Sequence, residues 1–248
     1  MDDFPVRTEQ FSIKSYDVDS SGRLRFTSLL QYFQEIAGLH AAELGVGYEE
    51  LVRWGAIWVL SRIRIDVTSM PSWGTGVTLL TRPIGVNRLF AMREFTMTDA
   101  DGGALLSAIT GWVILDTTTN RPGRVQLLPL APHLKQERPA PPDFLEKLIV
   151  PQRITLLYEK KVMASDLDVN QHVNNAAYVR WIVDAFSPEQ LAGRPIRRLR
   201  VHYLDAATFG QAIAISGGAD EHDEARFYVE GANRATGARV FQALVSWS

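Results

Sequence analysis

Apolar side chains recur at intervals of three and four residues between positions 26 and 44, which is the period of one face of an α-helix. This stripe consists of Phe26, Leu29, Leu30, Phe33, Ile36, Ala37, Ala41 and Leu44. A shorter stripe with the same spacing consists of Tyr178, Trp181, Ile182 and Ala185. The pattern therefore predicts two amphipathic helices, each with one buried face.

Alternating polar and apolar residues surround both predicted helices and are typical of half-buried strands. Runs that precede the helices lie at 11–16 and 155–162, and strand pairs that follow them lie at 62–74 and 198–210. Each half then ends with two long strands, at 90–99 and 104–116 in the first and at 226–232 and 238–247 in the second. Glycines at the joining turns, Gly102 and Gly237, allow the positive φ of a tight turn.

The two halves repeat one another. Asp17, Asp19 and the helix at 26–36 match Asp166, Asp168 and the helix at 175–185 at a constant offset of 149. For the strands that follow, the offset falls to 136, so the first half carries 13 extra residues around 45–56. Six of the twelve prolines lie between Pro129 and Pro151 and predict a linker over the surface.

One helix against four or five antiparallel strands, present twice, predicts an α+β arrangement. A long helix wrapped by a curled sheet is the hot-dog fold, and the repeat predicts two such domains that form an internal pseudo-dimer. The expected boundaries are 1–128 for the first domain, 129–151 for the linker and 152–248 for the second domain.

Composition narrows the classes of function. The 248 residues are 46% hydrophobic and 22% charged, as in folded globular proteins, and include no cysteine. This excludes disulfides, thiolate metal sites and a cysteine nucleophile. The formal net charge of −2 makes nucleic acid a poor partner. No apolar run has the roughly 18 residues of a membrane span, and the N-terminus lacks a signal-peptide pattern, so a cytoplasmic location is expected.

The residues that carry candidate chemistry lie in SDLDVNQHVNNAAYVRW, at 165–181. Asp168, Asn170 and His172 alternate just before the predicted helix, so their side chains are expected to face one way. A carboxylate, a carboxamide and an imidazole beside unpaired helix N–H groups suit an acyl-transfer centre. Asn174 or Asn175 is expected to cap the helix, and Asp166 to stabilise the preceding turn.

Metal sites are not expected in either half. Asp166, Asp168 and Asn170 begin like a calcium loop, but Gln171 and Ala177 occupy the positions that need glycine and glutamate. In the first half the final ligand position holds Ser28, which cannot supply a bidentate carboxylate. Zinc would need a second nearby histidine or a thiolate. No metal and no cofactor are therefore predicted.

The segment DLDVNQHVNNAAYVRWI resembles the signature of the acyl-ACP thioesterases of plants and bacteria. It is more loosely similar to the pattern of single-domain hot-dog acyl thioesterases. In the first half, WVLSRIRIDVTSMPSWGTGV resembles the corresponding tract of the same family, so the resemblance extends over residues 11–247. It implies hydrolysis of the thioester between a fatty acyl chain and acyl carrier protein (ACP) in fatty acid biosynthesis, by a monomer or a homodimer of pseudo-dimers.

The family's catalytic residues correspond to Asp168, Asn170 and His172. The resemblance implies Asp168 as general base or nucleophile, His172 as donor or proton shuttle and Asn170 as an orienting group. The first half has Asp19, Ser21 and Arg23 at the matching positions, which predicts a single active site per chain.

A departure from the family concerns the strand after the second helix. Plant members carry a glutamate and a cysteine there, where this chain has Ala206 and Ala207. Asp205 is the candidate auxiliary acid, although neighbouring strand residues point to opposite faces, so it would need a bulge to replace the glutamate.

The acyl chain is expected beside the helices, with Leu29, Leu30, Phe33 and Trp58 as candidate binding residues, although core packing is the simpler explanation for each of them taken singly. Two basic clusters, Lys160 with Lys161 and Arg194 with Arg197, Arg198 and Arg200, are more simply explained as solvated strand edges than as docking patches. If an acidic carrier docks on a basic face, the arginines at 194–200 are the candidates.

Three alternatives remain from the sequence. The carrier of the acyl group is coenzyme A (CoA) in the first alternative. The second is a hot-dog hydratase, whose Asp-x-Asn-Pro-x-His pattern differs from this chain in spacing and proline. The third is a non-catalytic acyl-binding protein, which Ala206 allows.

Overall fold

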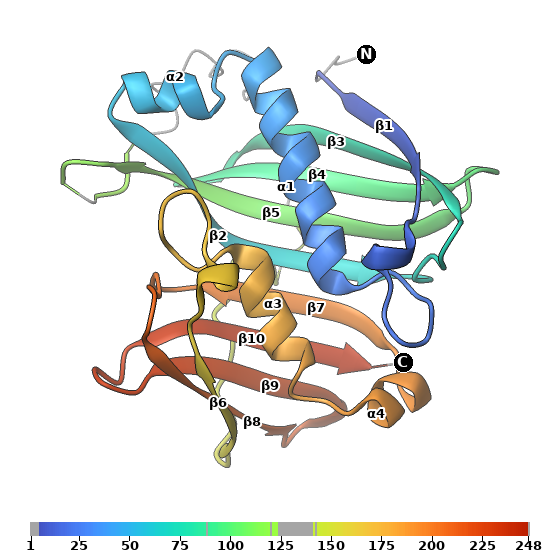
Figure 1. Cartoon of the computed structure of the whole chain (residues 1–248), viewed down its shortest axis with the longest axis vertical. Helices are drawn as coiled ribbons and strands as arrows, with labels where there is room; N and C mark the ends of the chain where they lie inside the picture. The colour runs from blue at the N-terminus through green and yellow to red at the C-terminus, as the bar shows by residue number, and fades with distance from the viewer. Residues whose placement is uncertain (1–4, 88, 120, 124–140, 142, 248) are drawn as a thin grey trace.

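A single antiparallel sheet runs through the whole molecule (Figure 1). The computed structural model describes residues 5–247 except 88, 120, 124–140 and 142. Within them, the strand order is β1-β3-β4-β5-β2-β7-β10-β9-β8-β6. The first half contributes β1 (Arg7–Ser12), β2 (Ala56–Val67), β3 (Gly76–Asn87), β4 (Phe90–Asp99) and β5 (Ala104–Asp116). The second half contributes β6 (Thr155–Lys161), β7 (Ile196–Tyr203), β8 (Ala212–Asp220), β9 (Asp223–Asn233) and β10 (Arg239–Trp247).

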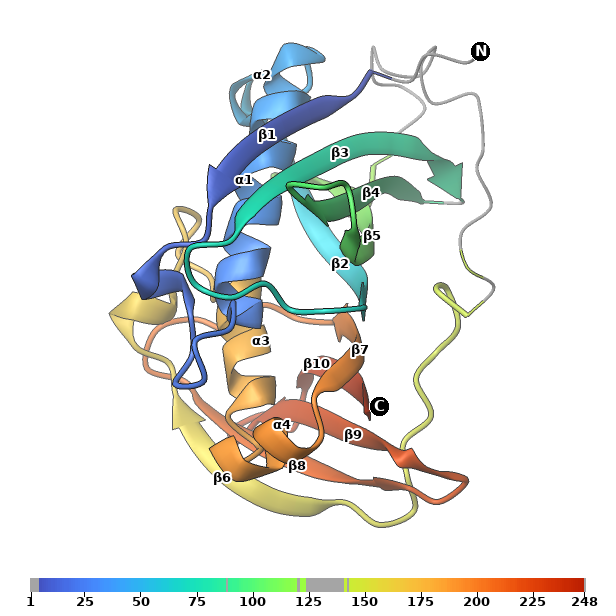
Figure 2. The same ribbon diagram turned by 90° about the vertical axis from the view of Figure 1, so that its right-hand side faces the viewer.

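Two main helices lie on one face of this sheet, where the sheet curls around them (Figures 1 and 2). They are α1 (Phe26–Glu43) and α3 (Asn175–Val183), and each follows a short 3-10 turn, η1 (Ser15–Asp17) or η3 (Ala164–Asp166). Two shorter helices, α2 (Tyr48–Arg53) and α4 (Pro188–Gly193), follow the main ones. The predicted α+β arrangement, with one main helix against a curled sheet in each half, is confirmed.

The halves join through the central strands β2 and β7, which pair antiparallel from Arg62 opposite His202 to Asp66 opposite Arg198. Alternate residues of these strands, such as Ile65 and Leu199, face the helices and are fully buried. One hydrophobic core therefore extends across both halves and fixes how they are placed relative to each other.

Residues 143–154, which lead into β6, run along the face of the sheet opposite the helices (Figure 2). Of the linker predicted at 129–151, residues 129–140 and 142 lie outside the described residues. In the described part, Phe144 is buried beside Ile84 and Met92. The carboxylate of Asp143 lies 2.6 Å from Arg64 and 3.4 Å from Arg200. Apolar contact and ion pairs thus hold this segment on the sheet.

Some predicted boundaries were wrong. The first predicted strand, at 11–16, starts earlier and ends at Ser12, because the following residues form the turn η1. The pattern gave no explicit assignment for β3 and β8. The extra residues of the first half lie largely in α1, which has 18 residues against 9 in α3, whereas α2 and α4 have 6 residues each. No helix in the described part of the chain has the length and apolar character needed to cross a membrane.

Candidate active site

The loop between η3 and α3 is anchored by Asp166. This carboxylate is fully buried and accepts a hydrogen bond from the Met163 amide at 2.8 Å. It also pairs with Arg180 of α3, and the ammonium of Lys160 lies 3.4 Å away. Asp166 therefore stabilises the turn before the helix, as the sequence predicted. The N-cap is Asn174, whose side chain accepts from the Ala176 amide at 2.8 Å.

Asp168 shapes the turn that follows. Its Oδ1 accepts hydrogen bonds from the backbone amides of Asn170, at 2.8 Å, and His172, at 3.3 Å. Its own amide donates to the His172 carbonyl at 2.8 Å. Gln171 sits at the tip with φ of 62°, a left-handed conformation that non-glycine residues rarely adopt. The other oxygen of Asp168 accepts no hydrogen bond from any described residue, so it is available for chemistry.

The loop is fastened to the segment after β7. His172 forms a bridge with Thr208, and the Val173 amide donates to the Ala207 carbonyl at 2.9 Å. In turn, the Ala207 amide donates to the hydroxyl of Tyr178 at 3.0 Å. These bonds set the position of the loop relative to α3.

A cavity of about 210 Å³ opens beside this loop. It is enclosed by α1, α2 and strands of the first half, and among the described residues that line it only Asn170 comes from the second half. The other lining residues are Gln34, Ala37, Gly38, Ala41, Val46, Tyr48, Leu51, Ile57, Trp58, Pro83, Ala91, Met92, Arg93 and Trp112. The carboxamide of the candidate catalytic loop thus meets a largely apolar cavity made by the other half.

The three predicted catalytic residues lie on one loop, but their side chains do not hydrogen-bond to one another. Asn170 borders the cavity, whereas Asp168 is half-buried and His172 is exposed. Within the described residues, the imidazole of His172 forms no hydrogen bond. The structure therefore places the three residues within one short loop, and of the three only Asn170 lines the cavity.

The predicted acyl-binding residues divide into two groups. Trp58 lines the cavity, and its indole N–H donates to the Val46 carbonyl at 2.9 Å. Leu29, Leu30 and Phe33 instead lie in the core and do not line the cavity; the ring of Phe33 stacks on Phe95 with centroids 4.4 Å apart. Leu29 and Phe33 differ from the lining residues of α1 in helical phase, whereas Leu30 shares their face and lies nearer the N-terminus of the helix, before the cavity begins.

One end of the cavity wall is polar. Arg93 is buried there, and its guanidinium donates to Nδ1 of His40 at 3.0 Å and to Thr81 at 3.2 Å. No carboxylate of the described residues pairs with it. Burial lowers the pKa of Arg93 to about 10, and burial together with the Arg93 charge lowers that of His40 to about 4. Arg93 is therefore charged, and His40 neutral, at pH 7. Neither residue was predicted from the sequence, because a polar residue inside a helix or strand gives no sign of its burial.

Asp205 does not lie on a strand, contrary to the expectation. The strand β7 ends at Tyr203, and the amides of Leu204 and Asp205 share the Val240 carbonyl, as at a bulge. The argument from opposite strand faces therefore does not apply. Asp205 is exposed, and its Oδ1 accepts from the Ala206 amide at 2.9 Å.

Tyr178 is a buried residue beside this loop. Its pKa is raised to about 12, mainly by burial and further by the charges of Asp205 and Asp168. From the sequence, Tyr178 was predicted only as part of the apolar stripe of the helix, because its spacing is that of a core residue.

The arginines predicted to dock a carrier already interact with other groups of the chain. Arg198 pairs with Asp66, and Arg200 with Asp143. Arg194 lies over the Trp247 ring, and Arg197 donates to the Thr68 carbonyl. Described residues contain no group of three or more side chains placed to hold a metal ion.

Comparison with known proteins gives one family for both halves. The model of the acyl-ACP thioesterase N-terminal domain matches residues 5–127, and that of the C-terminal domain matches residues 154–248. The palmitoyl-acyl carrier protein thioesterase of Gossypium hirsutum chloroplasts is 28% identical over 216 residues, which are 82% of this chain and 50% of that protein. An oleoyl-acyl carrier protein thioesterase of Arabidopsis thaliana chloroplasts is 25% identical over 213 residues, 79% of this chain and 59% of that protein.

This chain thus spans about half the length of the curated relatives it matches. A solved acyl-ACP thioesterase from Bacteroides thetaiotaomicron is similar over the whole molecule. Its structure has a TM-score of 0.82 and 28% sequence identity, and the match covers 98% of each chain. The tandem hot-dog fold follows from this similarity, and the chain belongs to the acyl-ACP thioesterase family.

Proposed function

We propose that the protein hydrolyses the thioester between a fatty acyl chain and ACP and releases the free fatty acid, in fatty acid biosynthesis. The observation that carries the proposal is the position of Asn170. It places the Asp-x-Asn-x-His loop of the second half at the wall of an apolar cavity in the first half. The similarity to acyl-ACP thioesterases supports the same reaction.

In this proposal the acyl chain enters the cavity, and the thioester carbonyl lies beside Asn170. The free oxygen of Asp168 takes a proton from a water molecule, whose oxygen attacks the carbonyl carbon. The amide of Asn170 orients the carbonyl, and the protonated imidazole of His172 donates a proton to the departing thiolate sulfur. The proton that Asp168 took from water then restores His172. The carbon–sulfur bond breaks, and a fatty acid and a free carrier thiol result. Attack by Asp168 itself is the alternative first step.

The substitutions Asp168→Asn and His172→Ala test these roles. Each is expected to lower the turnover of acyl-ACP by roughly 10²- to 10⁴-fold, since positioned acid–base groups contribute about that much. Asp19→Asn is the matched control, because Asp19 holds the corresponding turn of the first half and should not affect turnover beyond its effect on stability. Equal turnover in all four proteins, with acyl-chain binding retained, would support a non-catalytic acyl-binding protein instead.

The choice of carrier needs a separate measurement. Hydrolysis of the same acyl group is compared on ACP and on CoA, at matched thioester concentrations. The proposal expects a higher kcat/KM with ACP, and the opposite order would make the protein an acyl-CoA thioesterase.

A further inference from the structure

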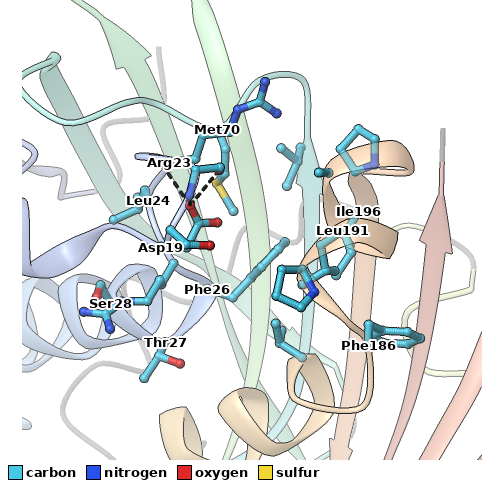
Figure 3. A pocket seen from close by; sticks show the side chains of 18 of the residues that line it. Asp19, Arg23, Leu24, Phe26, Thr27, Ser28, Met70, Phe186, Leu191 and Ile196 are labelled. Atoms are coloured by element: carbon cyan, nitrogen blue, oxygen red, sulfur yellow. Dashed lines mark hydrogen bonds between the residues drawn. The ribbon is translucent and has the colours of Figure 1, made fainter.

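A second and larger cavity lies at the position in the first half that corresponds to the candidate catalytic loop (Figure 3). Its volume is about 1200 Å³, and it lies between residues 19–28 of the first half and α3 and α4 of the second. In Figure 3, Asp19, Arg23 and Phe26 face it from one side, and Phe186 and Leu191 from the other. None of its lining residues borders the cavity beside Asn170.

The backbone around this cavity repeats that of the catalytic loop. Oδ1 of Asp19 accepts from the amides of Ser21, at 2.8 Å, and Arg23, at 3.1 Å, as Asp168 does from Asn170 and His172. The bridge between Arg23 and Ser72 corresponds to the bridge between His172 and Thr208. The first-half loop therefore retains the backbone shape of the candidate catalytic loop.

Two side chains of this first-half loop differ in chemistry from their counterparts in the candidate catalytic loop. A serine, Ser21, stands in place of Asn170, and Arg23 stands in place of His172. Arginine remains protonated at any physiological pH, so it cannot shuttle a proton, but it binds phosphate or carboxylate strongly. The loop has thus lost its acid–base group and gained a permanent cation.

The lining of the second cavity also differs from that of the first-half cavity. Phe186 occupies the position that corresponds to Ala37, one of the small residues lining the first-half cavity. Its ring packs edge-on against Phe227, with centroids 5.3 Å apart, and against Trp247, at 4.9 Å. A large, well-packed ring therefore stands where the first-half cavity, proposed for the acyl chain, has a small residue.

Charge at the second cavity favours an anion. Four arginines line it against two aspartates: Arg23, Arg25, Arg180 and Arg197 against Asp19 and Asp184. Among the described residues, nothing pairs with the guanidinium of Arg23, while Arg180 and Arg197 bind groups of the chain. Arg25 stands at the N-cap of α1, where the matching Asn174 caps α3, and it gives the first turn no side-chain hydrogen bond.

We propose that this cavity is a second, non-catalytic site for a phosphopantetheine arm that carries no long acyl chain. The phosphate meets Arg23, and the arm lies along Phe26, Met70 and Leu191. The choice of ligand rests on the proposed function, because the carrier arm that delivers the substrate is then available to this site. Here its phosphate, and not its thiol end, lies at the loop, since arginine binds phosphate and cannot shuttle a proton. The arm belongs either to the carrier after deacylation or to CoA, since both contain it.

Calorimetric titration with 4′-phosphopantetheine tests the proposal. Arg23→Ser is expected to weaken binding at this site about tenfold or more, because a charge-assisted contact to phosphate is lost. Pantetheine, which lacks the phosphate, should bind wild type and variant alike. Arg226→Ser is the matched control, since Arg226 is a half-exposed arginine on β9 that does not line the cavity. Met70→Trp fills the cavity without a change of charge and should abolish the same binding.

Unchanged affinity in both Arg23→Ser and Met70→Trp would overturn the proposal, as would an equal loss in Arg226→Ser. Displacement of the probe by the deacylated carrier or by CoA supports the site and identifies its source, and displacement by neither contradicts it. Thioester turnover separates the two proposals. If thioester turnover is retained but no binding depends on Arg23, only the proposal of the second site is contradicted. If binding depends on Arg23 but there is no turnover, only the proposed function is contradicted.

Discussion

Gly22 and Gln171 occupy the same turn position in the two halves, with φ of 76° and 62°. In the first half the residue is glycine, for which this conformation is free of strain, whereas in the candidate catalytic loop a residue with a side chain adopts it. Strain of this kind persists where the surrounding structure holds the backbone. Here the loop is held by the backbone hydrogen bonds that Asp168 accepts and by the bridge between His172 and Thr208.

The substitution Gln171→Gly should therefore raise the free energy of unfolding, by roughly 0.5–1 kcal/mol, because the strain is relieved. The reverse change in the other half, Gly22→Gln, should lower it by about 1 kcal/mol. No atom lies within 4 Å of a Cβ built at Gly22, so only the backbone conformation carries that cost. Urea unfolding of wild type and both variants measures these changes in unfolding free energy. A Gln171→Gly variant less stable than wild type would show that Gln171 is not strained.

The size of the residue at position 38 should set how long an acyl chain the cavity accepts. Gly38 lines the cavity in the middle of α1, and a Cβ built there meets nothing within 4 Å. Gly38→Leu should reduce turnover of long-chain acyl-ACP more than that of short-chain acyl-ACP. Gly38→Ala is the control, and it should stabilise the helix by about 1 kcal/mol with little change in preference. Equal loss across chain lengths in Gly38→Leu would place the chain elsewhere.

Stability should decrease as the pH falls from about 6.5 to 4, partly because of His40. Its pKa is lowered to about 4 in the folded protein, so in this range the unfolded chain binds a proton that the folded chain does not. The contribution is present above the unfolded pKa and is lost as the pH falls. His40→Gln keeps an acceptor for Arg93 and should flatten the dependence by on the order of 2 kcal/mol between pH 7 and 4.5. His222→Gln, at an exposed histidine, should leave the curve unchanged; parallel curves for wild type and His40→Gln would contradict the account.

The ion pairs of Asp143 should contribute to stability through the linker. Asp143→Asn leaves Arg64 and Arg200, both largely buried, without their shared carboxylate, and should cost roughly 1–3 kcal/mol in unfolding free energy. Asp223→Asn breaks an exposed pair with Arg226 and should cost less than 1 kcal/mol. Chemical denaturation compares the two, and equal effects would show that the linker contact is no stronger than a surface pair.

Local patterns were sufficient for the helices, because the stripe at 26–44 is set by residues three and four apart on one element. The same holds for Asn174 as the N-cap and Asp166 as the anchor of the turn, since both act within a few residues of their own position. The repeat at an offset of 149 was equally visible, because it compares the chain only with itself.

Which side of α1 lines a cavity was not visible in this way. Leu29 and Ala37 belong to one apolar stripe, yet only Ala37 reaches the cavity, since the curled sheet covers one side of the helix and leaves the other to the loop of the second half. Asp205 was misplaced for a related reason, because the end of β7 depends on pairing with β10 across the sheet.

The amino-acid sequence alone determined the duplicated architecture, the helices and the loop that carries Asp168, Asn170 and His172, because these follow from periodicity and short-range hydrogen bonding. The tertiary structure decided that Asn170 meets a cavity of the other half, that Arg93 is a buried cation and that a second cavity forms at Arg23. These features arise from contacts between residues far apart in the chain, and their cause is how the single sheet packs both halves against one pair of helices.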